Sequence, residues 1–198
     1  NNILIKPWNA KWIDAPNANS HNYGVYHFRK NFLLTEQPQQ FIIHVSADNR
    51  YKLYVNDEMV CFGPAKGDLY HWNFETIDIA PYLKKGNNII AAVVWNFGDA
   101  KPVWQVSYQT AFILQGDTRS EEILNTDDSW KCTQDKAYSP LQPQLIYTYY
   151  AAGATEKIDM NLYPEDWASL NFNDTSWANA HELFIGVPKN INHWSTGW

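Results

Sequence analysis

The fold is decided by residues 41–55, FIIHVSADNRYKLYV, which hold two apolar strand patterns separated by three polar residues. In the first half Phe41, Ile43, Val45 and Ala47 alternate with other residues, and in the second half Tyr51, Leu53 and Val55 do so. This repeat of two residues is typical of β-strands with one buried face and does not match the helical period of 3.6. The sequence therefore predicts two strands, with Asp48, Asn49 and Arg50 between them.

The rest of the chain continues this strand pattern. Residues 56–58, NDE, predict a hairpin turn to a third strand at 59–62. Further strands are predicted at 74–79, 89–96, 103–114, 121–124 and 145–150, because Gly, Pro, Asn or Asp separates most of these apolar runs. Residues 81–86, PYLKKG, predict a single helical turn. The pattern as a whole indicates an all-β fold, an antiparallel two-sheet β-sandwich.

We expect one domain over residues 1–198, with a core at 20–150 and with loops and strands of 151–198 packed on it. The later segment carries Trp167, Phe172 and Trp177, and in a soluble protein these rings must pack against another part of the chain. The chain begins with Asn1 rather than Met and stops in an aromatic stretch at Trp198. We therefore expect it to be a segment of a longer polypeptide.

Composition narrows the class of partner. Aromatic residues make up 16% of the 198 residues, and flat rings suit both sheet packing and stacking on sugars. The net charge is −6 and no run of Lys or Arg occurs, so neither nucleic acid nor a membrane is expected as a partner. Cys61 and Cys132 match no metal-binding spacing, and we expect two free thiols.

Motifs for catalysis are weak. The six histidines lack zinc-site spacing, and the chain has no glycine-rich phosphate loop and no nucleophile elbow. Glycosidases need two carboxylates across the scissile bond, and neighbours in sequence rarely take both roles. We therefore expect turn-capping or solvated roles for three carboxylate pairs, Asp127/Asp128, Glu156/Asp159 and Glu165/Asp166. Calcium stays open as a cofactor, because loops rich in Asp, Asn and backbone carbonyls can supply oxygen ligands.

The candidate binding site lies where polar residues interrupt the two strand patterns. Asp48, Asn49 and Arg50 offer acceptors and donors that match neighbouring sugar hydroxyls, and the ring of Tyr70 or Trp72 could cover an apolar sugar face. The alternative is a structural corner in which Asp48 and Asn49 bond to the local backbone.

Several stretches resemble the galactose-binding-like jelly-roll domains of glycoside hydrolases. They are residues 26–32, YHFRKNF, residues 47–56, ADNRYKLYVN, Gly63-Pro64, and residues 78–88, DIAPYLKKGNN. The second half narrows the resemblance to the N-terminal accessory domain of bacterial α-L-rhamnosidases, through residues 126–131, TDDSWK, 156–159, EKID, and 172–180, FNDTSWANA. The resemblance covers about residues 8 to 185. Met160-Asn161 depart from the small residues and Arg that the family shows more often.

The resemblance implies a function as well as a fold. In that family a separate α/α barrel later in the chain supplies the acid and base of an inverting mechanism. Some members carry a related jelly roll that binds terminal L-rhamnose with calcium, and the resemblance places the Asp-Asn pair of that sugar site on Asp48 and Asn49. Partners would be a rhamnose-containing glycan and the catalytic barrel of the same polypeptide. A periplasmic or extracellular location is implied too.

Three alternatives remain open from the sequence. The domain could be a purely structural scaffold of such an enzyme, or the N-terminal sandwich of a β-galactosidase-like hydrolase. An autonomous glycoside hydrolase that uses the carboxylate pairs named above is the third.

Overall fold

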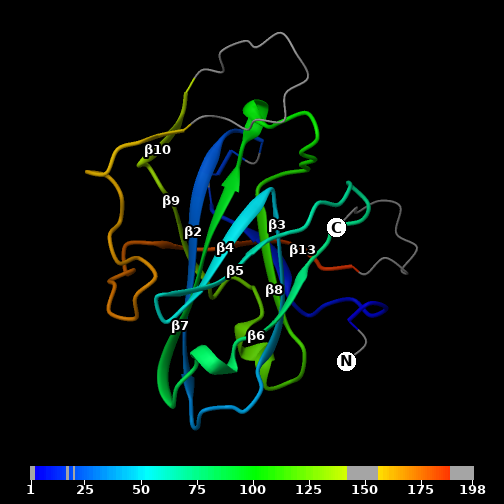
Figure 1. The fold of residues 1–198 in the computed structure, drawn as a ribbon, viewed down its shortest axis with the longest axis vertical. Coiled ribbons are helices and arrows are strands. Elements are labelled where there is room, and N and C mark those ends of the chain that lie inside the picture. Colours follow the sequence, from blue (N-terminus) through cyan, green and yellow to red (C-terminus); the bar gives the residue numbers. More distant parts are fainter. Residues whose placement is uncertain (1–2, 17, 20, 142–155, 188–198) are drawn as a thin grey trace.

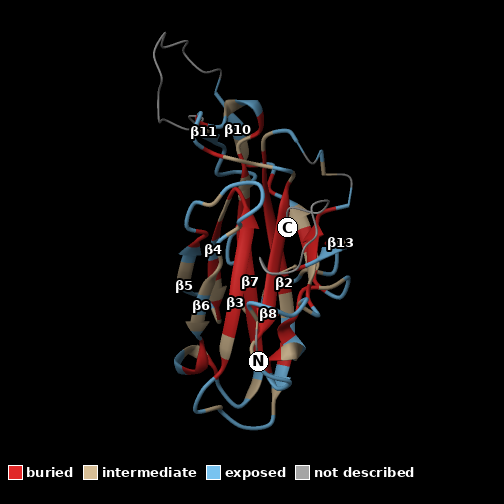
Figure 2. Cartoon of the chain, turned by 90° about the vertical axis from the view of Figure 1, so that its right-hand side faces the viewer, coloured by how far each residue is buried: buried red, intermediate tan, exposed pale blue. Residues whose placement is uncertain are grey.

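The structure is a computed structural model that describes residues 3–16, 18–19, 21–141 and 156–187. The chain forms two antiparallel sheets that pack face to face (Figures 1 and 2). The predicted all-β sandwich is confirmed. None of the helices in the described ranges is long and apolar enough to cross a membrane.

Six strands form the larger sheet in the order β12-β9-β2-β7-β4-β5, and five form the other in the order β13-β1-β8-β3-β6. The larger sheet consists of β2 (Gly24–Leu34), β4 (Arg50–Val55), β5 (Glu58–Gly63), β7 (Gly86–Asn96), β9 (Lys131–Gln134) and β12 (Ala178–Asn179). The smaller sheet consists of β1 (Lys11–Asp14), β3 (Ile42–Asp48), β6 (Glu75–Asp78), β8 (Ala111–Gly116) and β13 (His181–Ile185). A separate pair is formed by β10 (Tyr138–Pro140) and β11 (Glu156–Ile158).

The main core lies between the two sheets. Phe28 on β2 and Val94 on β7 point into it from the larger sheet, and they belong to one buried cluster with Val45 on β3 and Phe112 on β8. The rings of Phe28 and Phe112 stack with centroids 5.5 Å apart. These contacts cross from sheet to sheet, as the alternation of apolar residues in the sequence requires.

The outer face of the larger sheet carries apolar residues as well, and the covering segment, residues 159–177, packs on them. Val25 on β2 and Ile89 on β7 form a second buried cluster with Trp167 and Trp177 of this segment. His27, two residues after Val25 on β2, lies with its ring centroid 4.0 Å from that of Trp167. The central strands are therefore buried on both faces (Figure 2).

Arg29 ties the covering segment to β2. Its fully buried guanidinium donates from Nε to Asp174 Oδ2 at 2.9 Å and from Nη1 to the backbone oxygens of Trp167 and Ser169. The guanidinium carbon also lies 4.9 Å from the centroid of the Phe172 ring. Because a buried charge is costly unless it is paired and hydrogen-bonded, the segment and the arginine depend on each other.

The hairpin between β4 and β5 is confirmed, and Asn56 and Asp57 take positive φ angles of 49° and 75° there. Such angles match the type I′ turns that favour Asn and Asp. Cys61 and Cys132 are free thiols, as expected. The helical turn predicted at 81–86 is a shorter 3₁₀ turn, η1 (Ala80–Tyr82), because Gly86 already begins β7 with a φ of 98°.

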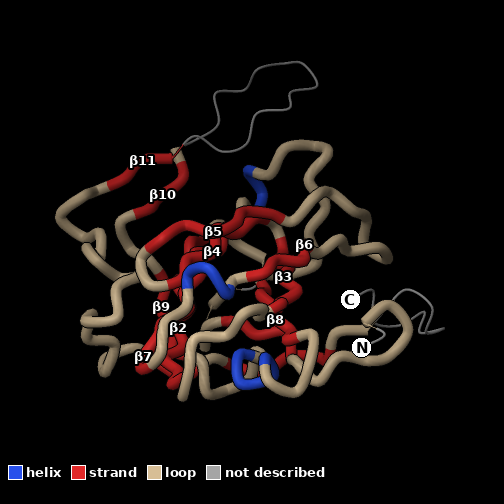
Figure 3. Tube along the Cα trace, turned by 60° about the horizontal axis from the view of Figure 1, so that its bottom comes forward, coloured by secondary structure: helices blue, strands red, loops and turns tan. Residues whose placement is uncertain are grey.

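Two strand predictions are wrong in part or in full. Residues 103–110 form a loop rather than the first part of β8, and Val103 is 78% exposed in it. Residues 121–124 form the 3₁₀ turn η3 (Glu121–Leu124), where the Glu121 carboxylate accepts a bond from the Thr118 backbone N–H at 2.8 Å. Figure 3 shows η3 with η1 and η2 (Gly98–Ala100) as the short helical turns, all outside the sheets. The strand predicted at 145–150 lies outside the described residues.

The single-domain prediction for residues 1–198 stays a prediction. What the structure describes of residues 156–187 contacts the sandwich by strand pairing and by packing. β12 pairs with β9, β13 pairs with β1, and the covering segment packs on the larger sheet.

Replacing Arg29 by Ala should destabilise the domain by roughly 3–5 kcal/mol, because it leaves the Asp174 carboxylate, which is 16% exposed, and buried backbone oxygens without their donor. Urea unfolding measures this loss, and limited proteolysis should show earlier cleavage within residues 159–177. Arg119→Ala, at an exposed arginine, is the matched control and should stay within about 0.5 kcal/mol of the parent. An Arg29→Ala protein as stable as the control would contradict the role given to this arginine.

Candidate functional site

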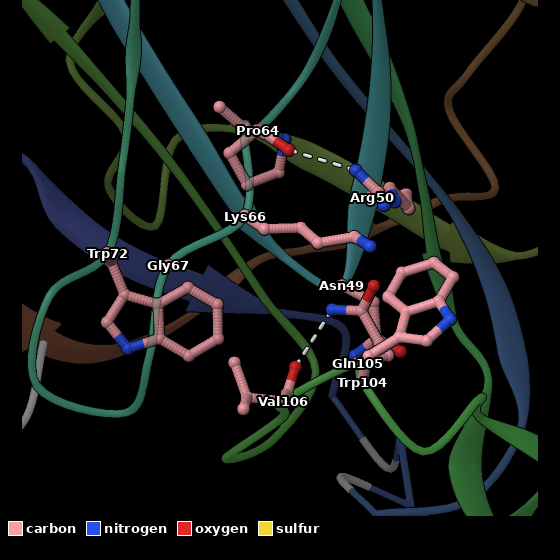
Figure 4. A pocket seen from close by; sticks show the side chains of 10 residues that line it. Asn49, Arg50, Pro64, Lys66, Gly67, Trp72, Trp104, Gln105 and Val106 are labelled. Atoms are coloured by element: carbon pink, nitrogen blue, oxygen red, sulfur yellow. Dashed lines mark hydrogen bonds between the residues drawn. The ribbon is translucent and has the colours of Figure 1, made fainter. Parts of the chain in front are cut away.

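A shallow hollow lies at the end of the sandwich where β3 passes into β4, with about 10 Å³ of enclosed space and the rest open to solvent. Three parts of the chain build it. These are the start of β4, the loop after β5 and the loop before β8, and Figure 4 shows their side chains around the opening. The lining residues are Asn49, Arg50, Pro64, Ala65, Lys66, Gly67, Trp72, Trp104, Gln105 and Val106.

Asp48 and Asn49 form the corner at which the chain changes sheets, and they are 0% and 1% exposed. One Asp48 carboxylate oxygen accepts the backbone N–H groups of Tyr108 and Gln109, and the other accepts the Asn49 amide at 2.6 Å. The Asn49 side chain also accepts the Phe97 backbone N–H at 3.1 Å. These polar atoms hold the loops around the hollow together. Asp48 does not line it, and sugar contact by this pair stays a prediction.

Arg50 and Lys66 bring two positive charges to one side of the hollow. Arg50 Nη1 donates to the backbone oxygen of Pro64 at 3.0 Å, which fixes the loop that follows β5 (Figure 4). The Lys66 ammonium lies over the Trp104 ring, 2.9 Å from its centroid, in a cation–π contact. No acidic residue is among the lining residues.

Trp72 and Trp104 stand on opposite sides of the hollow (Figure 4). Trp104 is 40% exposed, and Trp72 is half-buried against Trp12, with ring centroids 6.4 Å apart. Of the two rings that the sequence suggested, the structure therefore brings Trp72 to the hollow. Tyr70, on the same loop, is 67% exposed and does not line it.

Gln105 adds a polar group that has no partner within the described residues. The residue is 6% exposed, and its Nε2 donates to the Val106 backbone oxygen at 2.9 Å, whereas Oε1 is buried without a hydrogen bond. Because an unsatisfied buried acceptor is costly, such an atom points to a donor supplied from outside the described residues, for which water is one source.

Sequence reasoning missed three residues of the hollow, Lys66, Trp104 and Gln105. Trp104 and Gln105 lie within residues 103–114, which were predicted to form a strand. That prediction assigned their side chains to packing within a sheet. The signal that could have found them is Pro102, which disfavours a central strand and places the next residues in a loop. Lys66 carried no signal beyond its position after Gly63-Pro64.

The three carboxylate pairs differ in their hydrogen-bond partners. Asp127 accepts the Ser129 backbone N–H at 3.0 Å, and Asp159 accepts that of Asn161 at 3.1 Å, so both cap turns. Glu156 accepts the Tyr23 hydroxyl at 2.7 Å. No hydrogen bond or ion pair involves the side chains of Glu165 or Asp166 among the residues that the structure describes.

The residues at the corner do not fit a calcium ion. Asp48 already receives N–H donors on both carboxylate oxygens, and these would repel a cation. Over the described ranges, no group of three or more His, Cys, Asp or Glu side chains could hold a metal ion.

Burial raises the pKa of the Asp48 carboxyl to about 6, although its hydrogen bonds act in the opposite direction. The ordinary value is 3.8, so between pH 4 and 6 the folded state keeps a proton that the unfolded chain releases. The contribution of this group to stability is therefore fully present below about pH 4 and is lost as the pH rises through 6.

Asp48→Asn should accordingly become more stable relative to the parent by roughly 2–3 kcal/mol between pH 4 and pH 7. Urea unfolding at both pH values measures this, and any constant cost of the new amide cancels in the comparison. Asp99→Asn, an exposed site on the neighbouring turn η2, controls for the change in net charge. A stability difference that does not move with pH would contradict the raised pKa.

The sequence and the fold of this chain match those of a known domain family. Residues 36–193 match the family model of the α-L-rhamnosidase N-terminal domain. The family 78 rhamnosidase of Bacillus sp. GL1 superposes with a TM-score of 0.79 and 26% identity over 90% of this chain and 19% of its own. The α-L-rhamnosidase of Dictyoglomus thermophilum gives 0.65 and 19% over 89% and 21%, and that of Aspergillus terreus gives 0.64 and 21% over 88% and 21%.

No curated protein matches the sequence. The chain spans about a fifth of the length of the rhamnosidases it resembles. Because the family model matches well over half of the residues, the chain belongs to the α-L-rhamnosidase N-terminal domain family.

Proposed function

We propose that this chain is a non-catalytic accessory domain of an α-L-rhamnosidase-like glycoside hydrolase, and that it binds a rhamnose-containing glycan in the hollow. The observation that carries the proposal is the hollow between Trp72 and Trp104, which Gln105 also lines with a side chain whose buried Oε1 lacks a donor among the described residues. A sugar suits this arrangement. Its hydroxyls are donors, and its C–H faces pack on aromatic rings.

The non-catalytic part of the proposal rests on the carboxylates. An inverting or retaining glycosidase holds two of them on either side of one bond. The hollow has no acidic side chain in its lining, and Asp48 behind it is enclosed by N–H donors. The hydrolytic groups are then supplied by another part of the polypeptide.

Binding should be weak, on the order of 0.1–1 mM for a short oligosaccharide with a terminal L-rhamnose, because one shallow hollow desolvates few groups. Trp104→Ala should weaken it about 5- to 30-fold, since the variant removes an exposed wall of the hollow. Isothermal titration calorimetry or NMR shift titration measures both values.

Phe62→Ala is the matched control, because this ring is 71% exposed on β5 and does not line the hollow. It should bind the oligosaccharide as the parent does. Failure of the folded parent domain to bind at 20 mM sugar would reject the proposal, as would equal losses in the two variants.

A second candidate function, a scaffold for the rest of the polypeptide, is favoured by the edge of the larger sheet. β5 is the outermost strand there, and Met59 and Phe62 are 53% and 71% exposed on it. Exposed apolar groups on an edge strand are typical of a surface that another segment covers. If the domain binds no sugar, this is the function that remains.

A further inference from the structure

We propose that the hollow selects a glycan that carries a carboxylate, so that the sugar beside rhamnose is a uronic acid whose carboxylate pairs with Arg50 and Lys66. This inference rests on the proposed function and names the class of glycan that the same site takes.

The first argument is uncompensated positive charge. The ion pairs within the described residues include neither Arg50 nor Lys66, although the protein as a whole carries a net charge of −6. The pKa of Lys66 is lowered, by partial loss of hydration first and by the charge of Arg50 second, so the two cations are close enough to repel each other. An anion between them would relieve this repulsion.

The nearby carboxylates are already engaged elsewhere. Glu75 accepts the Tyr51 hydroxyl at 2.9 Å and the Ala65 backbone N–H at 2.8 Å. Asp68 accepts the His71 imidazole at 2.8 Å. The chain thus satisfies these acids with other donors and leaves the two cations of the hollow without an acidic partner in the described part of the chain.

The second argument concerns the remaining donors of Arg50. One of its N–H groups is used by the Pro64 oxygen, and no other described residue hydrogen-bonds to this side chain. The bond to Pro64 orients the guanidinium, so its other donors are presented in a fixed fork. A planar carboxylate can accept two parallel N–H bonds from such a fork, which a neutral hydroxymethyl group cannot do.

The third argument is the position of Lys66 on Trp104. A neutral sugar that stacks on this face of the ring must displace the ammonium and gains only a hydrogen bond from it to a hydroxyl. A sugar with a carboxylate can use the displaced ammonium as an ion-pair partner. The same contact therefore disfavours neutral ligands and favours acidic ones.

The test compares two disaccharides, α-L-rhamnosyl-D-glucuronic acid and the same compound with its carboxyl reduced to a hydroxymethyl group. The parent domain should bind the acid about three- to twentyfold more tightly at low salt, because two partly exposed charge pairs are formed. Added salt should reduce this preference. Lys66→Gln should bring the preference down to about twofold, without a change in melting temperature because the side chain is exposed.

Lys101→Gln, which removes the same charge from an exposed position outside the lining, should keep the parent's preference. Equal affinity for the two disaccharides would overturn the carboxylate assignment and leave the sugar-binding proposal intact. Binding of neither would reject both. If a 6-sulfate of the reduced disaccharide binds as tightly as the acid, the hollow recognises negative charge in general and not a carboxylate. This result would overturn the assignment to a uronic acid.

Discussion

The structure depends on one constraint, the passage of the chain from the smaller to the larger sheet within the two residues Asp48 and Asn49. β3 ends at Asp48 and β4 begins at Arg50, so no loop is present to absorb the change of direction. The buried carboxylate and amide bond instead to backbone groups of Phe97, Tyr108 and Gln109, which belong to the loop before β8. The corner thereby fixes the same loop that carries Trp104 and Gln105.

A second constraint comes from the central strands, which are buried on both faces. β2 and β7 pair along their full lengths, and each places alternate side chains into the core and onto the outer face. A sheet of this kind needs a cover on each side. The covering segment meets this need over the larger sheet, and Arg29 supplies the polar contacts that its irregular backbone lacks. Residues 159–177 lie outside both sheets, yet they contribute to the stability of the sandwich.

Much of the fold could be predicted because local pattern and tertiary environment agree there. The alternation at 41–47 and 51–55 marks β3 and β4, and Asn56-Asp57 marks the hairpin, since each residue type suits its position for a local reason. Prediction failed where a run of apolar residues did not enter a sheet. Residues 121–124 contain Ile123 and Leu124 but form a turn, because the Glu121 side chain bonds to the backbone of Thr118.

The candidate site was predictable only in part. Asp48, Asn49 and Arg50 stand out in sequence because polar residues interrupt apolar strands, whereas Lys66 and Trp104 lie 38 residues apart (104 − 66) in loops without a pattern. Their contact exists because two separate loops are anchored to the corner, one through Arg50 and Pro64 and the other through Asp48. Long-range juxtaposition of this kind is a property of the assembled sandwich.

This division of the site has a chemical consequence. The residues that hold the loops, Asp48 and Asn49, are enclosed and have little freedom to change without loss of the fold. The residues that face solvent, Lys66 and Trp104, make one contact with each other and can be replaced without touching the core. In the proposed site, ligand selectivity can therefore be changed through the exposed pair without a change at the corner beneath it. A ligand preference should accordingly be sought in the loops and not in the polar residues that first draw attention in the sequence.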